Sequence, residues 1–230
     1  MKRFRKAVVD RFIRLVDPLA TLLVRLNVAP NTLTTIGTVC TVAGGVAFAL
    51  GAIRTAGFII AAAAFFDVLD GMVARRGERA TIFGAFYDST LDRLADGALL
   101  GGLAFFFATS PAHANPVMVA VAIAGMIGTF LVSYTRARAE ALGITLRIGF
   151  MQRAERIVLL SVPQALFGLA LDGVVLTAVV TLVAISAWIT ATQRVLFVRR
   201  ATGAPVYKPL RVLTYKNPLR ARFASRRAQS

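Results

Sequence analysis

Long apolar stretches constrain this chain more than any other feature of its sequence. A helix that crosses a bilayer needs roughly 20 mostly apolar residues. We expect six such helices, at about residues 31–50, 56–74, 83–108, 116–136, 157–171 and 174–198, of which the fifth is short. Hydrophobic residues make up 57% of the 230, more than the roughly one half that is usual in soluble domains. The sequence therefore predicts an all-α polytopic membrane protein.

The first 30 residues form a separate juxtamembrane segment. Apolar residues recur there at helical spacing between charges, at Phe4, Val8, Phe12, Leu15, Leu19, Leu22 and Leu26. A helix of this kind lies in the membrane interface, and an ordinary surface helix is the alternative. We expect three parts: the amphipathic segment over 1–30, the six-helix domain over 31–200 and a basic cytoplasmic tail over 201–230.

The basic residues predict the orientation, because cytoplasmic loops carry an excess of Lys and Arg. With six spans, all but one of the 27 Lys and Arg residues fall on one side, and Arg54 alone falls on the other. We therefore expect a multi-pass protein of the cell (plasma) membrane with both termini in the cytoplasm. The net charge of +16 is then a collar that faces anionic lipid, and we expect no nucleic-acid partner.

Five aspartates crowd the ends of the second and third predicted spans: Asp67, Asp70, Asp88, Asp92 and Asp96. Charged residues at membrane depth are costly and are functional candidates. Spacings of three and four residues put the side chains on one face of each helix, so two antiparallel helices can turn four carboxylates toward one point. Oxygen ligands suit Mg²⁺, Mn²⁺ or Ca²⁺, and two such ions can assist an in-line displacement at phosphate. A cation or proton relay in a transporter is the alternative.

Two glycines and an arginine accompany the aspartates. Gly71 follows Asp70 directly, and Gly84 lies one turn before Asp88. Glycine costs a helix about 1 kcal/mol relative to alanine, but it lets a flat base or a phosphate approach the backbone. Arg75 adds a guanidinium fork that suits phosphate. The pattern favours a phosphate-bearing nucleotide beside the carboxylates.

The stretch from Asp67 to Asp92 resembles the signature of the CDP-alcohol phosphotransferases, D-x-x-D-G-x-x-A-R-x8-G-x3-D-x3-D, at every fixed position. The resemblance, which covers about residues 4–200, implies a homodimer that binds two Mg²⁺ ions, with Mn²⁺ as a possible substitute. It implies metal ligation by Asp67, Asp70, Asp88 and Asp92, and makes Asp92 the expected general base. The acceptor hydroxyl would attack the β-phosphate of a CDP-lipid, and CMP would leave.

The same resemblance implies the residues that hold the CDP-lipid. Small residues of the signature would make room for the cytidine nucleotide, and polar residues would hold it. This set is Asn31, Thr32, Gly71, Ala74, Arg75, Thr81 and Gly84.

Three further segments resemble those of the prokaryotic phosphatidylinositol-phosphate synthases. The resemblance implies that Arg136, Arg153 and Arg194 form the pocket for the acceptor's phosphate, and three guanidinium groups suit a dianion. The expected reaction joins the phosphatidyl group of CDP-diacylglycerol to inositol 1-phosphate, giving phosphatidylinositol phosphate. Glycerol 3-phosphate or serine is the alternative acceptor. Membrane topology alone is the alternative reason for some of these basic residues.

Overall fold

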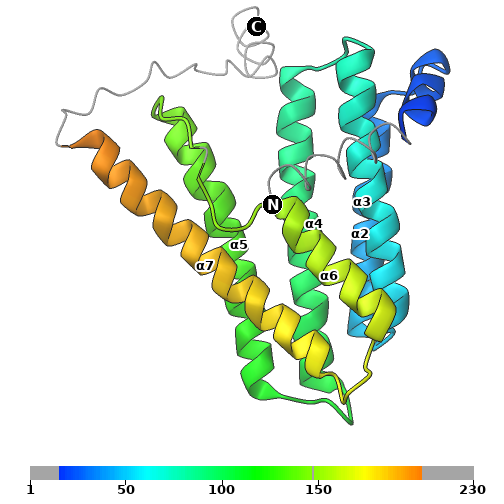
Figure 1. Ribbon diagram of the computed structural model, residues 1–230, viewed down its shortest axis with the longest axis vertical. Coiled ribbons are helices and arrows are strands. Elements are labelled where there is room, and N and C mark those ends of the chain that lie inside the picture. The colour runs from blue at the N-terminus through cyan, green and yellow to red at the C-terminus, as the bar shows by residue number, and fades with distance from the viewer. Residues whose placement is uncertain (1–15, 147, 204–230) are drawn as a thin grey trace, which may run out of the picture.

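The computed structural model describes residues 16–146 and 148–203, and in these ranges the secondary structure is entirely helical (Figure 1). A helical segment over 16–25 precedes six longer helices. These are α2 (Pro30–Ala49), α3 (Ile53–Arg76), α4 (Ile82–Thr109), α5 (Pro116–Ala141), α6 (Arg153–Phe167) and α7 (Val174–Thr202). The predicted all-α class is confirmed. The first half of the predicted amphipathic segment and nearly all of the basic tail lie outside the described residues.

Local capping explains where the helices nearest the aspartates begin. The Thr81 side chain accepts a hydrogen bond from the Gly84 amide at 2.9 Å and starts α4, as expected of a threonine N-cap. The Glu155 side chain accepts from the Gln152 amide at 3.0 Å, so α6 begins at Arg153, four residues before the predicted start. This difference puts Arg153 in the first turn of a helix.

The helices form one antiparallel bundle in which α2 is the common support for α3 and α4. Helix α6 packs on α3, α5 packs on α4, and α7 packs on both α5 and α6. Within the described residues, no Cα atoms of α3 and α4 approach within 8 Å. The two helices that carry the aspartates therefore face each other across a space instead of packing directly.

Glycines set the closest helix crossing. A Cβ atom added at Gly102 would overlap the carbonyl oxygen of Gly45, and one at Gly45 would overlap that of Ala98. Small residues allow such close backbone approach between membrane helices. These glycines thus bring α4 against α2 within one chain.

Two apolar clusters hold the bundle together. The larger one joins all six helices from α2 to α7 around buried side chains that include Phe48, Ile60, Leu99, Met118, Leu160 and Val180. The smaller one packs the 16–25 segment against α2 and the C-terminal half of α3, through Val16, Ala20, Leu33, Leu69, Met72 and Val73. The second cluster thereby supports the turn of α3 that carries Asp70.

Four of the helices, α2, α3, α5 and α7, are long and apolar enough to cross a membrane. Helix α4 has 28 residues but carries charged side chains along its first half, and α6 has only 15 residues. By length and composition, four of the six predicted spans are therefore confirmed as candidate membrane helices, and α4 and α6 do not meet this criterion.

Candidate active site

Helices α3 and α4 turn aspartates toward the space between them. Asp67 and Asp70 lie on α3, and Asp88 and Asp92 lie on α4. Asp67 and Asp92 both contact the guanidinium of Arg153 from α6. The Arg153 Nη1 atom lies 2.9 Å from Asp67 Oδ2 and 3.0 Å from Asp92 Oδ1. One positive group therefore bridges the two helices.

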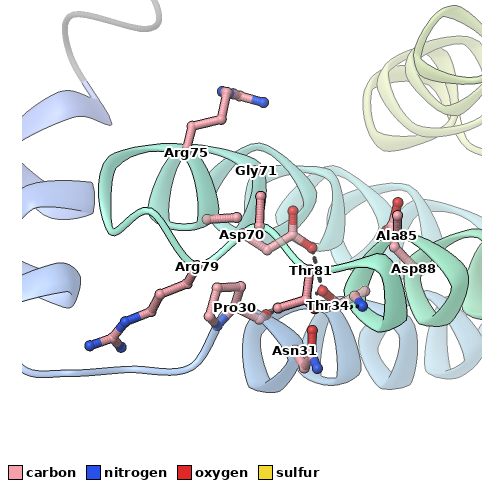
Figure 2. Close-up of a pocket in the computed structure, with 13 residues that line it drawn as sticks. Pro30, Asn31, Thr34, Asp70, Gly71, Arg75, Arg79, Thr81, Ala85 and Asp88 are labelled. Atoms are coloured by element: carbon pink, nitrogen blue, oxygen red, sulfur yellow. Dashed lines mark hydrogen bonds between the residues drawn. The ribbon is translucent and has the colours of Figure 1, made fainter.

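Asp70 has a different partner. Its side chain is buried, with the residue 8% exposed, and its Oδ2 atom accepts a hydrogen bond of 2.7 Å from the Thr34 hydroxyl on α2. Figure 2 shows this hydrogen bond beside Pro30 and Asn31 at the start of α2. Asp88 is exposed by comparison. The four predicted ligands thus surround one region at different depths.

The donor set fits a divalent cation. It consists of carboxylate oxygens, which Mg²⁺ and Mn²⁺ prefer, and the oxygens of Asp67 and Asp92 already converge on one positive group. Among the described residues, no three His, Cys, Asp or Glu side chains converge as a metal site requires. Arg153 holds two of the carboxylates, and Thr34 holds a third.

A cavity of about 220 Å³ opens beside Asp70 and Asp88 (Figure 2). Six of the seven residues predicted to hold the CDP-lipid line it, namely Asn31, Gly71, Ala74, Arg75, Thr81 and Gly84. Thr32 does not line it and is exposed. The helical rotation of α2 turns Asn31 and Thr34 toward the cavity and Thr32 away from it.

The two signature glycines keep this cavity open. A Cβ atom at Gly71 would lie 3.2 Å from Arg75 Nη1, and one at Gly84 would lie 3.0 Å from Thr81 Oγ1 and 3.3 Å from Asn31 Oδ1. Any larger side chain would enter the cavity itself.

A second cavity, of about 770 Å³, lies on the other side of Asp88. Arg136, Arg153 and Arg194 all line it, together with Asp92. Arg136 pairs with Glu140 at 2.9 Å, and Arg194 donates to the carbonyl oxygens of Ile148, at 3.1 Å, and Val132. Three arginines from α5, α6 and α7 therefore surround one space next to the carboxylates.

Sequence reasoning missed two residues of α2. Thr34 binds Asp70, and Gly37 packs against Asp67, since a Cβ atom there would lie 3.1 Å from Asp67 Oδ1. A signal was present: Thr34, Thr38 and Thr41 recur at helical spacing in an otherwise apolar helix, and all three are buried. Polar residues on a buried face of a membrane helix point to a partner.

The family model and the similar proteins point to the same family. Residues 27–195 match the family model described as CDP-alcohol phosphatidyltransferase. The phosphatidylinositol phosphate synthase of Streptomyces avermitilis is 38% identical over 199 residues, which cover 84% of this chain and 81% of the relative. The archaetidylinositol phosphate synthase of Pyrococcus horikoshii is 39% identical over 174 residues, which cover 75% of this chain and 85% of the relative.

Solved structures agree. The crystal structure of Mycobacterium tuberculosis phosphatidylinositol phosphate synthase with CDP-DAG bound has a TM-score of 0.76 and 30% identity, covering 86% of this chain and all of that one. The same enzyme in complex with manganese and citrate has a TM-score of 0.71 and 31% identity, covering 79% of this chain and 87% of that one. This integral membrane protein therefore belongs to the CDP-alcohol phosphatidyltransferase family.

Proposed function

We propose that this enzyme transfers the phosphatidyl group of CDP-diacylglycerol to inositol 1-phosphate, giving phosphatidylinositol phosphate and CMP. One observation carries the proposal: two cavities of different chemistry meet at Asp88, which lines both. One cavity contains the signature glycines, and the other contains three arginines. A donor nucleotide and a phosphorylated acceptor can thus reach the same carboxylates from two sides. The transporter alternative is not retained, because the family consists of transferases.

The smaller cavity suits the nucleotide of the donor. Gly71, Ala74 and Gly84 leave room for a flat base, and Asn31 and Thr81 offer polar side chains around it. Arg75 supplies positive charge for the diphosphate. The CDP-DAG bound to the Mycobacterium tuberculosis relative supports this choice of donor.

The larger cavity suits the acceptor's phosphate. Arg136, Arg153 and Arg194 can each donate charge-assisted hydrogen bonds to a dianion. Serine carries a single carboxylate and no phosphate, so it offers these three guanidinium groups no dianion. The synthase names of the relatives favour inositol 1-phosphate over glycerol 3-phosphate.

Two Mg²⁺ ions, which Mn²⁺ can replace, are the cofactors we propose, and the manganese complex of the relative supports a divalent ion. Asp67, Asp70, Asp88 and Asp92 would hold them. When bound, such ions acidify the attacking hydroxyl and neutralise charge on the leaving phosphate.

The residues of the chain then have separate roles in the proposed reaction. Asp92 accepts the proton of the acceptor hydroxyl as general base. The hydroxyl oxygen forms a bond to the β-phosphorus of the CDP-lipid. The bond from that phosphorus to the oxygen shared with the α-phosphate breaks, and CMP leaves with that oxygen. The arginines of the larger cavity hold the acceptor's own phosphate away from the reacting centre.

An acceptor panel tests the proposal. Purified protein in detergent with Mg²⁺ and CDP-diacylglycerol should release CMP when inositol 1-phosphate is added, and should not when unphosphorylated inositol or serine is added. Chelation with EDTA should stop the reaction, and Mg²⁺ or Mn²⁺ should restore it. Release with glycerol 3-phosphate alone would overturn the choice of acceptor. Absence of release with every acceptor would overturn the transferase proposal.

Asp92→Asn tests the general base. Losing a general base typically costs about 10²–10⁴-fold in rate, so CMP release should fall by this factor while CDP-diacylglycerol binding persists. A matched Asp→Asn control is Asp172, whose side chain is 94% exposed. Loss of donor binding together with turnover would mean that Asp92 acts mainly as a metal ligand.

We also propose six membrane spans, both termini in the cytoplasm, an interfacial helix near the N-terminus and a homodimer. Helix directions alternate along the bundle (Figure 1), which supports α4 and α6 as spans alongside the four apolar helices. The near-absence of basic residues on one side supports the orientation. The three-part division at residues 30 and 200 belongs to the same proposal.

A further inference from the structure

Arg153 occupies the position that two of the proposed metal ligands need. Its Nη1 atom lies between Asp67 Oδ2 and Asp92 Oδ1, at 2.9 and 3.0 Å. A divalent cation bound by the same two oxygens would repel the guanidinium and take its place. The same side chain lines the cavity proposed for the acceptor's phosphate. Arg153 therefore has two competing sets of anionic partners.

Asp96 contacts Arg153 from another direction. This aspartate lies one turn beyond Asp92 and outside the family signature. Its Oδ1 atom is 3.4 Å from Arg153 Nε, which is a different edge of the guanidinium from the one that meets Asp67 and Asp92. This contact is an ion pair and not a hydrogen bond, because Nε has no hydrogen-bond partner among the described residues. Asp96 can thus keep hold of Arg153 when the other two carboxylates release it.

Asp96 is a buried carboxylate that pairs with two arginines. The residue is 5% exposed, and its Oδ2 atom lies 4.0 Å from Nη2 of Arg156, which is also buried. That oxygen has no hydrogen-bond partner among the described residues. A buried carboxylate is strongly unfavourable unless cations pair with it, so Asp96 depends on both arginines.

We propose that Asp96 is a positioning residue that controls where Arg153 points. When a divalent cation takes Asp67 and Asp92, Asp96 retains the Nε edge of Arg153, and the Nη1 end turns to a phosphate in the larger cavity. Metal binding and acceptor binding are then positively coupled, and the coupling is reciprocal. The identities of the phosphate ligand and of the metal ligands rest on the proposed function, whereas the competition between Arg153 and the cation can be measured without any transferase activity.

Mn²⁺ binding without any substrate tests the competition. The free Mn²⁺ concentration would be followed by electron paramagnetic resonance in wild-type protein, Arg153→Gln, Asp96→Asn and the double variant. Arg153→Gln should raise Mn²⁺ affinity, within the roughly 5–150-fold range of such couplings. Asp96→Asn should lower it on the order of tenfold, because Arg153 then has only Asp67 and Asp92 as partners.

The double variant separates a positioning role from a structural one. Without Arg153, the Asp96→Asn change should no longer lower Mn²⁺ affinity, since contacting residues show their coupling in such cycles. Asp172→Asn, in the exposed turn between α6 and α7, is the matched control and should bind Mn²⁺ like the wild type. An Arg153→Gln protein that binds Mn²⁺ more weakly would overturn the proposal. The proposal would also be overturned if Asp96→Asn lowered Mn²⁺ affinity equally with Arg153 present and with Arg153 replaced.

Kinetics supply the second readout. At saturating Mg²⁺, Asp96→Asn should raise KM for inositol 1-phosphate about tenfold with a smaller change in kcat, and Asp96→Glu should restore part of the loss. Suppose that the four proteins give the Mn²⁺ affinities expected above but the wild type releases no CMP with any acceptor. The proposed transfer reaction then fails, and the competition stands. If the wild type releases CMP but the variants do not show the expected Mn²⁺ affinities, only the positioning role of Asp96 is overturned.

Discussion

At the scale of single residues, Thr34 is the side chain that links α2 to the aspartates. Its hydroxyl donates to Asp70 over 2.7 Å, and both residues are buried. A buried carboxylate with a fixed hydrogen bond keeps one orientation, which a metal ligand needs. Thr34 therefore belongs to the site although it lies 36 positions before Asp70 in the chain.

Thr34→Val removes this hydrogen bond and keeps the shape of the side chain. Leaving Asp70 without its donor should cost about 1–3 kcal/mol of stability. The Mg²⁺ concentration that gives half-maximal CMP release should rise on the order of tenfold. Thr35→Val is the control, because Thr35 is exposed and contacts Tyr87 instead. An unchanged Mg²⁺ dependence would show that Thr34 does not position Asp70 for metal.

Gly71 is a second residue whose effect can be separated from folding. Alanine in the interior of a helix is about 1 kcal/mol more favourable than glycine, so Gly71→Ala should not destabilise the protein. Its methyl group would lie against Arg75 Nη1 in the smaller cavity. We expect KM for CDP-diacylglycerol to rise roughly tenfold or more, while the thermal unfolding temperature holds or rises.

The matched control for this change is Gly101→Ala in α4, where a Cβ atom would meet nothing within 4 Å. Its kinetics should match those of the wild type. If Gly71→Ala leaves KM for the donor unchanged, the smaller cavity does not hold the nucleotide.

At the scale of helices, α2 decides how far apart the two aspartate helices stand. Both α3 and α4 pack on α2 and, in the described part of the chain, not on each other. The crossing of α2 and α4 depends on Gly45 and Gly102, whose missing side chains let the two backbones meet. The width of the site is thus set on a helix that contributes none of its carboxylates.

Gly45→Val should disrupt this crossing. The added side chain would overlap the backbone of α4 at Ala98, and backbone has little freedom to move away. We expect a loss of about 1–3 kcal/mol or more in unfolding free energy, measured by thermal or denaturant unfolding in detergent. Gly101→Val, one residue from the crossing glycine of α4, should be tolerated. Equal stability of the two variants would contradict the crossing described here.

At the scale of the whole molecule, the charges and the helix directions together imply a membrane orientation. Basic residues cluster at the end of the bundle that carries the loop between α3 and α4, whereas Arg54 lies at the start of α3. The site lies toward the basic end, so in the orientation proposed above soluble CMP and inositol 1-phosphate would be exchanged with the cytoplasm.

Cysteine labelling tests this orientation, because Cys40 is the only cysteine of the chain. In a Cys40→Ala background, cysteine replaces Glu78, Ala112 or Asp172, all of which are exposed loop positions. A membrane-impermeant maleimide should label the Ala112 and Asp172 variants in intact cells and the Glu78 variant only after lysis. Protection of the Asp172 variant in intact cells would show that the short helix α6 does not cross.

The sequence by itself determined the helices and the identity of the aspartates. Long apolar stretches predict helices because a backbone in lipid must satisfy its own hydrogen bonds. Spacings of three and four residues put Asp67 with Asp70, and Asp88 with Asp92, on one helix face. These relations are local, so periodicity is enough to find them. The all-α class and the family followed from this local information and the family signature.

Only the tertiary structure decided which distant residues meet the aspartates. Arg153 lies 86 positions after Asp67, and it reaches Asp67 because α6 packs on α3. The Thr34 contact and the α2–α4 crossing at Gly45 also join separate helices. Such contacts depend on how closely helices pack, and that depends on small side chains at the crossings. Periodicity along one helix carries no information about its neighbour, so these contacts could not be predicted from the sequence.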